Sequence, residues 1–337
     1  MIDSFFLAES PESVGIDSDK LEALLTRAAK EVDEGLLPAC QVAIARNGKI
    51  AALASFGTAT DDSLFNVFSS TKAITSAAGW LLIQDGKLDT SERVADIVPE
   101  FGTHGKDAIT VEQLFTHTAG FPHAPFRVAE WPNRKRRLER YGEWTLNWPV
   151  GTRFEYHPTS SMYVIAEIIE RRSGTEFAEF VRQRISKPLG LPNMFLGCPP
   201  SEHHRIVPVT HHGEAMTAAD YAALGVPMPP VTEVTEDALT AFNSAETRQV
   251  PVPGGGGIMS AAELALFYQA LLHGRAFDGT QIWREKTLKD ALKVRNHFPD
   301  MMGVPANRAL GVIIAGDEHR NARGFGHTNS PLAFGHG

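Results

Sequence analysis

Two side chains that could work together in catalysis lie three positions apart, Ser69 and Lys72. On a helix, residues at this spacing share a face, so the amine can approach the hydroxyl. A serine hydroxyl is a weak nucleophile until a neighbouring base or cation helps it to lose its proton. If Ser69 lies at the start of a helix, the positive end of the helix dipole adds to that effect. The pair therefore predicts an activated serine nucleophile.

The Ser-x-x-Lys pattern is short, and a structural role for Ser69 competes with the catalytic one. Roughly one match is expected by chance in a chain of this length, and serine is a common helix N-cap. The residues that follow favour catalysis. Almost every residue from 71 to 83 is apolar or small, and the run ends at Gly86, which suits the left-handed position after a helix. Because a helix that is apolar on all sides belongs in a protein interior, we predict a buried helix with Ser69 at its start.

Length and composition limit the fold and its partners. The chain has 337 residues, which suggests about two domains or subdomains. Its hydrophobic fraction of 43% and charged fraction of 21% are those of a soluble globular protein, and a net charge of −8 argues against nucleic acid as a partner. The N-terminus lacks the basic start of a secretory signal, and no stretch is long enough to span a bilayer. Cys40 and Cys198 make no disulfide framework, so we expect a cytoplasmic protein with no membrane partner.

The spacing of apolar residues indicates strands near both ends of the chain and helices between them. Residues 39–56 read as a β-hairpin around the tight turn Asn47-Gly48, and residues 309–315 are strand-like. Helical spacing is found at 18–34, 111–116, 161–172, 177–185 and 261–273. We therefore predict a mixed α/β fold of the α+β type, with one antiparallel sheet built from both termini.

The predicted subdomain boundaries fall beside the nucleophile and beside a run of glycines. Residues 1–68 and 251–337 would form a discontinuous α/β sheet subdomain, and residues 69–250 a mostly helical one that begins with the nucleophile helix. The glycine run, 254–257, lacks the Lys-Ser/Thr that a phosphate loop needs. We expect it instead to let the backbone pass close to the site.

Several motifs occur in the order typical of a known family. Residues 109–122 read ITVEQLFTHTAGFP, residues 149–156 read PVGTRFEY, and residues 255–264 read GGGIMSAAEL. Together with Ser69-x-x-Lys72 they resemble the serine β-lactamase and penicillin-binding-protein superfamily, in particular its class C-like esterase branch. The resemblance covers about residues 10–337. It implies a β-lactamase/transpeptidase-like fold, in which helices flank the sheet.

The resemblance implies a role for each of three residues. Ser69 would be the acylated nucleophile, Lys72 would be partly desolvated with a lowered pKa, and Tyr156 would pass the proton to the leaving group. The backbone N–H of Ser69 would donate to the oxyanion. The competing interpretation of Tyr156 is a core tyrosine with a bonded hydroxyl.

Aromatic residues before Tyr156 border the acyl pocket in the family, and an apolar acyl group would suit them. An equally supported interpretation is that these residues pack in the hydrophobic core. The residues concerned are Phe121, Phe126, Trp131, Trp144 and Trp148.

Two departures from the family pattern affect the predicted activity. The first is Pro158, which stands where the family has an asparagine that contacts the lysine and the substrate amide. Proline offers neither a side-chain hydrogen bond nor an N–H, and Thr159, Ser160 or Ser161 could take over. Loss of an amide-reading group favours simple esters over peptides and β-lactams.

The second departure concerns the family's third motif, which lies on a strand beside the nucleophile and near the oxyanion. His336 and Gly337, after Phe334-Gly335, match its beginning, and residues 326–329 are a weaker candidate. Family members continue with further strands and a closing helix. We therefore expect an open edge at the hairpin, and a chain that is unstable or poorly active unless a partner chain completes the sheet.

The remaining features predict no other chemistry. Two histidine pairs, at 203–204 and 211–212, match no metal signature, and the basic run 134–137 reads as a solvated helix face. No Gly-x-Ser-x-Gly elbow occurs, which argues against an α/β-hydrolase.

The sequence thus predicts a serine carboxylesterase that cleaves small acyl esters through a Ser69 acyl-enzyme, without a metal or other cofactor. One alternative is a weak β-lactamase or D-alanyl-D-alanine carboxypeptidase. Another is an inactive binding protein that keeps Ser69, Lys72 and Tyr156 as relics. The expected partner is a small ester or β-lactam-like substrate, and the sequence is compatible with a homo-oligomer.

Overall fold

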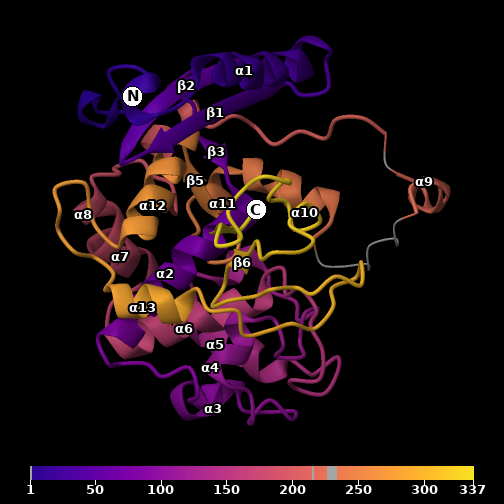
Figure 1. Cartoon of the computed structure of the whole chain (residues 1–337). Coiled ribbons are helices and arrows are strands. Elements are labelled where there is room, and N and C mark those ends of the chain that lie inside the picture. Colours follow the sequence, from indigo (N-terminus) through magenta and orange to yellow (C-terminus); the bar gives the residue numbers. More distant parts are fainter. Residues whose placement is uncertain (1, 215, 226–233) are drawn as a thin grey trace.

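A long β-hairpin and the helix outside it form a layer at one end of the molecule (Figure 1). The structure, a computed structural model, describes residues 2–214, 216–225 and 234–337. Strands β1 (Ala39–Arg46) and β2 (Lys49–Gly57) pair antiparallel. Between them Asn47 and Gly48 both have a positive φ, 53° and 74°, as a tight hairpin turn of this twist requires. The predicted hairpin and its turn are confirmed.

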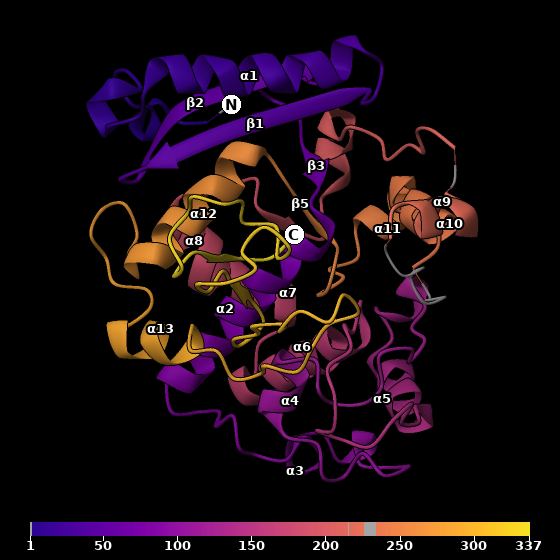
Figure 2. The same ribbon diagram turned by 45° about the vertical axis from the view of Figure 1, so that its right-hand side comes forward.

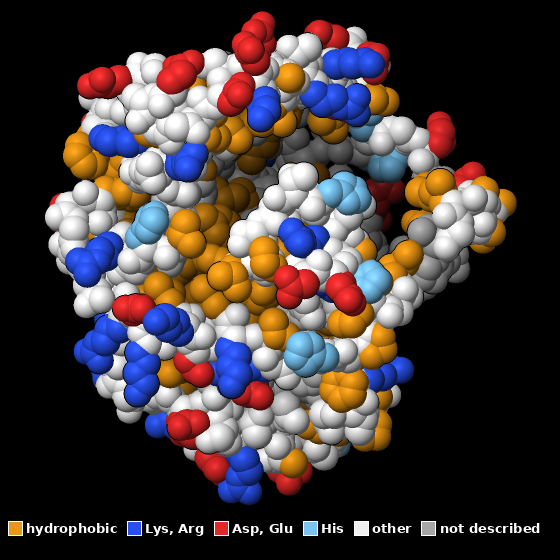
Figure 3. All heavy atoms as spheres, in the orientation of Figure 1, with side chains coloured by type: hydrophobic (Ala, Val, Ile, Leu, Met, Phe, Trp, Pro, Cys, Tyr) orange, Lys and Arg blue, Asp and Glu red, His pale blue; other side chains and the backbone are white. Residues whose placement is uncertain are grey.

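Helices cover both faces of this hairpin (Figure 2). Helix α1 (Ser18–Asp33) lies on one face, and α12 (Ala261–His273) packs against the other. In the described part of the chain β1 pairs only with β2, so its outer edge is open, as expected from the sequence. Figure 3 shows hydrophobic side chains gathered in a hollow between this layer and the C-terminal loops.

Helix α2 (Thr71–Gln84) runs through the centre of the molecule, and all but its last two residues are buried. The indole N–H of Trp283 donates to the Ala77 carbonyl over 3.0 Å, which ties α2 to the C-terminal part of the chain. The helix ends before Gly86, whose φ is 69°. The predicted buried helix is confirmed. Because its stability comes from packing on all sides, it is a rigid base for the residues at its start.

A small antiparallel sheet lies next to the start of α2. Strand β5 (Gly257–Met259) pairs with β3 (Phe65–Asn66) on one side and with β4 (Phe195–Leu196) on the other. Since β3 leads directly to Ser69, this pairing brings the end of the glycine run beside the nucleophile segment.

The C-terminal strands form a separate pair, β6 (Ile313–Ile314) with β7 (Phe334–Gly335). Strands thus come from both ends of the chain, as predicted, but among the described residues they are divided between the hairpin and two small sheets. Only β6 remains of the strand expected over 309–315, because Gly311, with φ 81°, turns the chain. The division into residues 1–68 with 251–337 and 69–250 stays a prediction.

The middle of the chain is mostly helical, as predicted. The helix expected over 177–185 is α7 (Phe177–Val181), followed by a π-helical turn, Arg182–Ser186. No helix in the described ranges is long and apolar enough to cross a membrane. The other helices are α3 (Val94–Ile97), α4 (Val111–Phe115), α5 (Arg134–Glu143), α6 (Ser160–Ser173), α7 (Phe177–Val181), α8 (Lys187–Leu189), α9 (Ala218–Ala223), α10 (Glu236–Thr240), α11 (Ala245–Arg248) and α13 (Glu285–Ala291).

The basic run at the start of α5 is partly buried, so the prediction of a solvated face was wrong for one of its members. Arg137 is buried and donates to Glu170 Oε2 over 2.6 Å and to the Trp131 carbonyl over 2.9 Å. A buried guanidinium is tolerated where a carboxylate and a carbonyl take its hydrogens. Helix α6 supplies that countercharge, which the local sequence of α5 does not reveal.

Candidate active site

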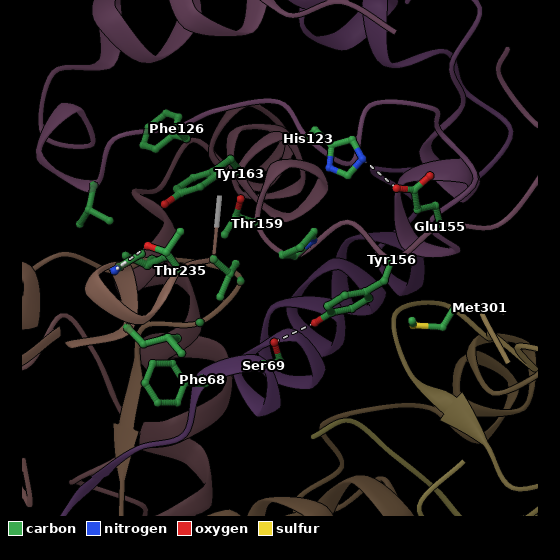
Figure 4. A pocket seen from close by; sticks show the side chains of 18 of the residues that line it. Phe68, Ser69, His123, Phe126, Glu155, Tyr156, Thr159, Tyr163, Thr235 and Met301 are labelled. Carbon is green, nitrogen blue, oxygen red and sulfur yellow. Dashed lines mark hydrogen bonds and ion pairs between the residues drawn. The ribbon is translucent and has the colours of Figure 1, made fainter. Parts of the chain in front are cut away.

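Three side chains predicted to act together lie in mutual contact at the start of α2. Lys72 Nζ donates to Ser69 Oγ over 3.0 Å, and the Tyr156 hydroxyl donates to the same oxygen over 2.7 Å. Lys72 Nζ also lies 5.0 Å from the centre of the Tyr156 ring. Figure 4 shows the phenol pointing at Ser69 across the wall of a cavity. The fold thus brings together residues 87 positions apart in the sequence.

The backbone presents Ser69 in a conformation that differs from an ordinary helix cap. Ser69 lies in a 3₁₀ turn, Phe68–Ser70, that leads into α2, and the N-cap of α2 is Ser70, without a side-chain cap. Ser69 therefore does not serve as the N-cap. Phe68 has a positive φ of 39°, a conformation that costs about 1–3 kcal/mol for a residue with a side chain. Such strain is found at functional sites, and here it is next to the hydroxyl.

The glycine run passes close to this turn, as expected from the sequence. Lys72 Nζ donates to the Gly254 carbonyl over 2.7 Å, and Gly257 N–H donates to Thr71 Oγ1 over 2.8 Å. A Cβ atom on Gly257 would lie 2.7 Å from that Oγ1, too close for any side chain. The Gly254 carbonyl therefore binds the lysine, a contact that the family resemblance assigned to the missing asparagine.

Burial changes the proton affinity of Lys72. Lys72 is fully buried, and desolvation lowers its pKa, with Arg308 adding to the decrease and Tyr156 opposing it. Removing water from an ammonium favours the neutral amine. A lysine in this state can accept a proton from the serine or from the phenol more readily than one in water.

Two neutral histidines hold the backbone on either side of Tyr156. Burial lowers the pKa of His157 to about 3 and that of His117 well below its ordinary value. His157 Nε2 accepts from Phe121 N–H over 3.2 Å, so its proton is on Nδ1, 2.6 Å from the Glu155 carbonyl. The His157 N–H in turn donates to His117 Nδ1 over 3.2 Å. These bonds fix the segment from which the phenol projects.

A cavity of about 950 Å³ opens beside Ser69 and Tyr156. This volume is within the range of small-molecule sites. Helix α10 and the segment after it form one wall, and most of the lining is apolar (Figure 4). Its largest apolar members are Phe68, Phe126, Phe154, Tyr163, Leu239 and Phe242.

The third predicted motif also reaches the site. The His336 ring is buried and its centre lies 5.8 Å from that of Tyr156. The backbone N–H of His336 donates to the Tyr268 hydroxyl over 3.1 Å, and the ring Nδ1 lies 3.1 Å from the Gly337 carbonyl. Burial lowers the pKa of His336 well below its ordinary value, so the ring is neutral near pH 7. The weaker candidate, residues 326–329, lies in loops, with 326 and 327 at a separate surface hollow.

A family model described as Beta-lactamase matches residues 25–337. The chain belongs to this family. A putative D-alanyl-D-alanine carboxypeptidase of Salmonella enteritidis PT4 is 24% identical over 365 residues, which span 97% of this chain and 79% of that protein. A penicillin-binding-protein homolog from Caulobacter crescentus superposes with a TM-score of 0.77 at 26% identity, over 94% of this chain and 85% of that one. A family VIII carboxylesterase gives 0.74 at 25% identity, over 93% and 84%.

These likenesses establish a β-lactamase fold and a family of hydrolases that includes esterases and carboxypeptidases. Of the five aromatic residues predicted to border an acyl pocket, four do not line the cavity. Phe121 and Trp144 are buried and stacked at 5.8 Å, and the Trp144 indole donates to the Pro125 carbonyl. The Trp148 indole donates to Glu155 Oε2 over 3.1 Å. None of the three is a lining residue of the cavity, so the alternative of core packing describes them. Phe126 does line it.

The residues after Tyr156 divide in the same way. Pro158 and Thr159 line the cavity, whereas Ser160 and Ser161 are buried. Ser160 Oγ donates to the Phe121 carbonyl over 3.0 Å. Of the three hydroxyls that could replace the family asparagine, Thr159 is therefore the one that lines the cavity.

The histidines of the two pairs in this β-lactamase-family protein contact different partners. His211 pairs with Glu236, His212 donates to the Gly35 carbonyl, and His203 contacts the Cys198 carbonyl. Within the described ranges, no group of three or more His, Cys, Asp or Glu could hold a metal ion.

Arg308 was not predicted from the sequence as a site residue. Its guanidinium is buried and lies 5.4 Å from the centre of the Tyr156 ring and 5.3 Å from that of Phe154. A single arginine outside every recognised motif gives no signal in the sequence.

Proposed function

We propose that this protein is a serine hydrolase that cleaves small esters through an acyl-enzyme on Ser69. One observation carries the proposal: Ser69 Oγ accepts hydrogen bonds from both Tyr156 and Lys72 at the edge of an apolar cavity. A hydroxyl with a potential base on each side is the arrangement that nucleophilic catalysis needs.

In the proposed reaction, Tyr156 as a phenolate takes the Ser69 proton while Oγ attacks the ester carbonyl. The tetrahedral intermediate collapses when the phenol returns that proton to the departing alcohol, which leaves the acyl group on Ser69. Water then attacks the acyl-enzyme, Tyr156 takes a proton from it, and Ser69 regains its own. The backbone N–H of Ser69 is the proposed first donor to the oxyanion. The second donor is proposed to lie near the backbone that follows His336. The phenolate forms beforehand, when the neutral amine of Lys72 takes the phenol's own proton.

The lining of the cavity favours esters over peptides. Most of its wall is apolar, and Arg153, a cation of the lining, is paired with Glu155 at 2.8 Å. A peptide that ends in D-alanine brings a carboxylate, which needs a free cation. Pro158 also lacks an amide-reading side chain. Carboxypeptidase activity, after the name of the Salmonella relative, is the second candidate because that likeness spans nearly the whole chain.

Covalent labelling tests the proposal. Intact-mass spectrometry with a fluorophosphonate should show one adduct, which Ser69→Ala abolishes. Ser70→Ala is the matched control, because the Ser70 hydroxyl is next to Ser69 in the chain and does not cap helix α2. This variant should still form the adduct. The variants that form the adduct should also hydrolyse p-nitrophenyl butyrate, and Ser69→Ala should not. Incubation with penicillin should leave the mass of the protein unchanged. No adduct would refute the hydrolase, while a stable penicilloyl adduct would favour the carboxypeptidase.

A further inference from the structure

Arg308 is a buried cation that the catalytic scheme above does not use. Its backbone pairs with Asn296, with Arg308 N–H donating to the Asn296 carbonyl and the reverse, both over 3.2 Å. Only 8% of the residue is exposed. The guanidinium lies against the rings of Phe154 and Tyr156, at 5.3 Å and 5.4 Å from their centres.

The guanidinium has no anionic partner in the described part of the chain. Its Nε and Nη1 are buried without a hydrogen-bond acceptor, and no carboxylate forms an ion pair with it. Asp300 attracts it only from a distance. Arg137, the other buried arginine described above, donates instead to a carboxylate and a carbonyl. Because an unpaired buried charge costs stability, an arginine in this position calls for a negative charge that is present for part of the time.

The two rings beside Arg308 lie between its guanidinium and the cavity. Phe154 and Tyr156 line the cavity, whereas Arg308 is not a lining residue. A substrate carboxylate in the cavity would therefore meet these rings first. Among the groups that can become negative, Tyr156 has the larger electrostatic effect on Arg308, ahead of Asp300.

We propose that Arg308 is a positioning residue that stabilises the negative phenolate oxygen of Tyr156 during turnover. This inference rests on the proposed hydrolase function, because in that reaction Tyr156 must be a phenolate before it takes the proton of Ser69. The anion missing from the resting site is then the phenolate itself, which forms when Tyr156 gives its own proton to the neutral amine of Lys72.

The other basic groups around Tyr156 are poorly suited to this role. They are Lys72 from α2, His117 after α4 and His336 after β7. Burial lowers the pKa of each of the three. Burial also lowers the pKa of Arg308, but only to about 10, so the guanidinium stays charged near pH 7. Glu155 is paired with His123 and Arg153 and points away from the phenol (Figure 4).

The pH dependence of kcat/KM on p-nitrophenyl butyrate tests the assignment. In Arg308→Met the acidic limb should move to higher pH by about one to two units, the effect of losing one opposite charge at this range. Activity near pH 7 should fall about tenfold or more and recover in alkali. Arg308→Lys should restore most of the wild-type limb. A limb that stays in place in Arg308→Met, with activity reduced equally at every pH, would overturn the proposal.

Folding does not obscure this test. Arg308→Met removes an unpaired buried charge and keeps apolar volume, so its melting temperature should equal or exceed that of the wild type. Arg295→Met is the matched control: Arg295 precedes the Asn296 pairing and is bonded to Glu112 and Asp290. It should lower the melting temperature and leave the acidic limb unchanged. A lower melting temperature for Arg308→Met, with an unmoved limb, would make Arg308 a structural residue only.

The two proposals fail in different ways. If wild-type protein takes no fluorophosphonate and hydrolyses no ester, the hydrolase function fails. If Ser69 is labelled and the wild type is active but the limb of Arg308→Met does not move, only the role of Arg308 fails.

Discussion

Removing one oxygen atom from Tyr156 tests the proposed reaction most directly. In Tyr156→Phe the ring keeps its place beside Lys72 and Arg308, and only the hydroxyl that lies 2.7 Å from Ser69 Oγ is lost. A positioned acid–base group contributes about 100- to 10,000-fold to a rate. At 1.36 kcal/mol per factor of ten, this is about 2.7–5.4 kcal/mol of transition-state stabilisation. The loss should fall on kcat rather than on KM, because the phenol acts on atoms that react.

The stability of the same variant should hardly change. The hydroxyl is only part-buried, and one hydrogen bond contributes about 0.5–1.5 kcal/mol to folding. Tyr141→Phe is the matched control, because the buried Tyr141 hydroxyl donates to the Tyr163 carbonyl over 3.1 Å, away from Ser69. We expect it to lower the free energy of unfolding by about 0.5–1.5 kcal/mol and to leave kcat unchanged.

Initial rates over a range of ester concentrations, with urea unfolding of each variant, separate the two effects. A Tyr156→Phe protein that keeps more than about a tenth of the wild-type kcat would show that the phenol does not carry the proton. A comparable loss of kcat in Tyr141→Phe would show that activity merely follows stability. Either result would refute the reasoning from the geometry of the site.

Three further predictions follow from the packing and the buried charges. Gly257→Ala places a Cβ atom 2.7 Å from Thr71 Oγ1, so it should lower the free energy of unfolding by about 1–3 kcal/mol in urea and slow fluorophosphonate labelling; normal stability would contradict this. Because burial lowers the pKa of His157 to about 3, the unfolded chain binds a proton below about pH 6.5 that the folded one rejects. The free energy of unfolding should thus be highest above about pH 6.5 and fall by about 1.4 kcal/mol per pH unit towards pH 3. The slope should be shallower in His157→Gln. A free energy of unfolding that does not change over this pH range would contradict the prediction. Leu239→Trp narrows the cavity, so kcat/KM should fall about tenfold more for a long-chain p-nitrophenyl ester than for the acetate; equal losses would place the acyl chain elsewhere.

The predictions that held are those that depend on local pattern. The apolar run after Ser69 has no exposed face, so its burial follows from composition alone. The turn at Asn47 and Gly48 needs positive φ angles, which these residue types readily adopt. The contact of Tyr156 with Ser69 came from the resemblance, since no periodicity relates two positions 87 residues apart.

The predictions that failed depended on which way a side chain points. Phe121 and Trp144 flank the segment of Tyr156 in sequence, yet they stack on each other in the core. The cavity takes Leu239 and Phe242 from a much later segment. Composition could not assign these aromatic residues, because core and pocket walls use the same types. Tertiary packing decides between them.

The charges around Tyr156 make chemical sense as a set. In the described part of the chain, neither Lys72 nor Arg308 has an ion pair with a carboxylate, although both are buried. A permanent carboxylate here would hold a proton or neutralise the lysine, and the phenol would lose its advantage as the proton acceptor. Leaving Arg308 unpaired lowers stability in the resting state but favours the Tyr156 phenolate, and the neutral amine of Lys72 can take the phenol's proton. The same reasoning explains why the histidines beside the phenol are buried and neutral: they hold its backbone without adding charge of their own.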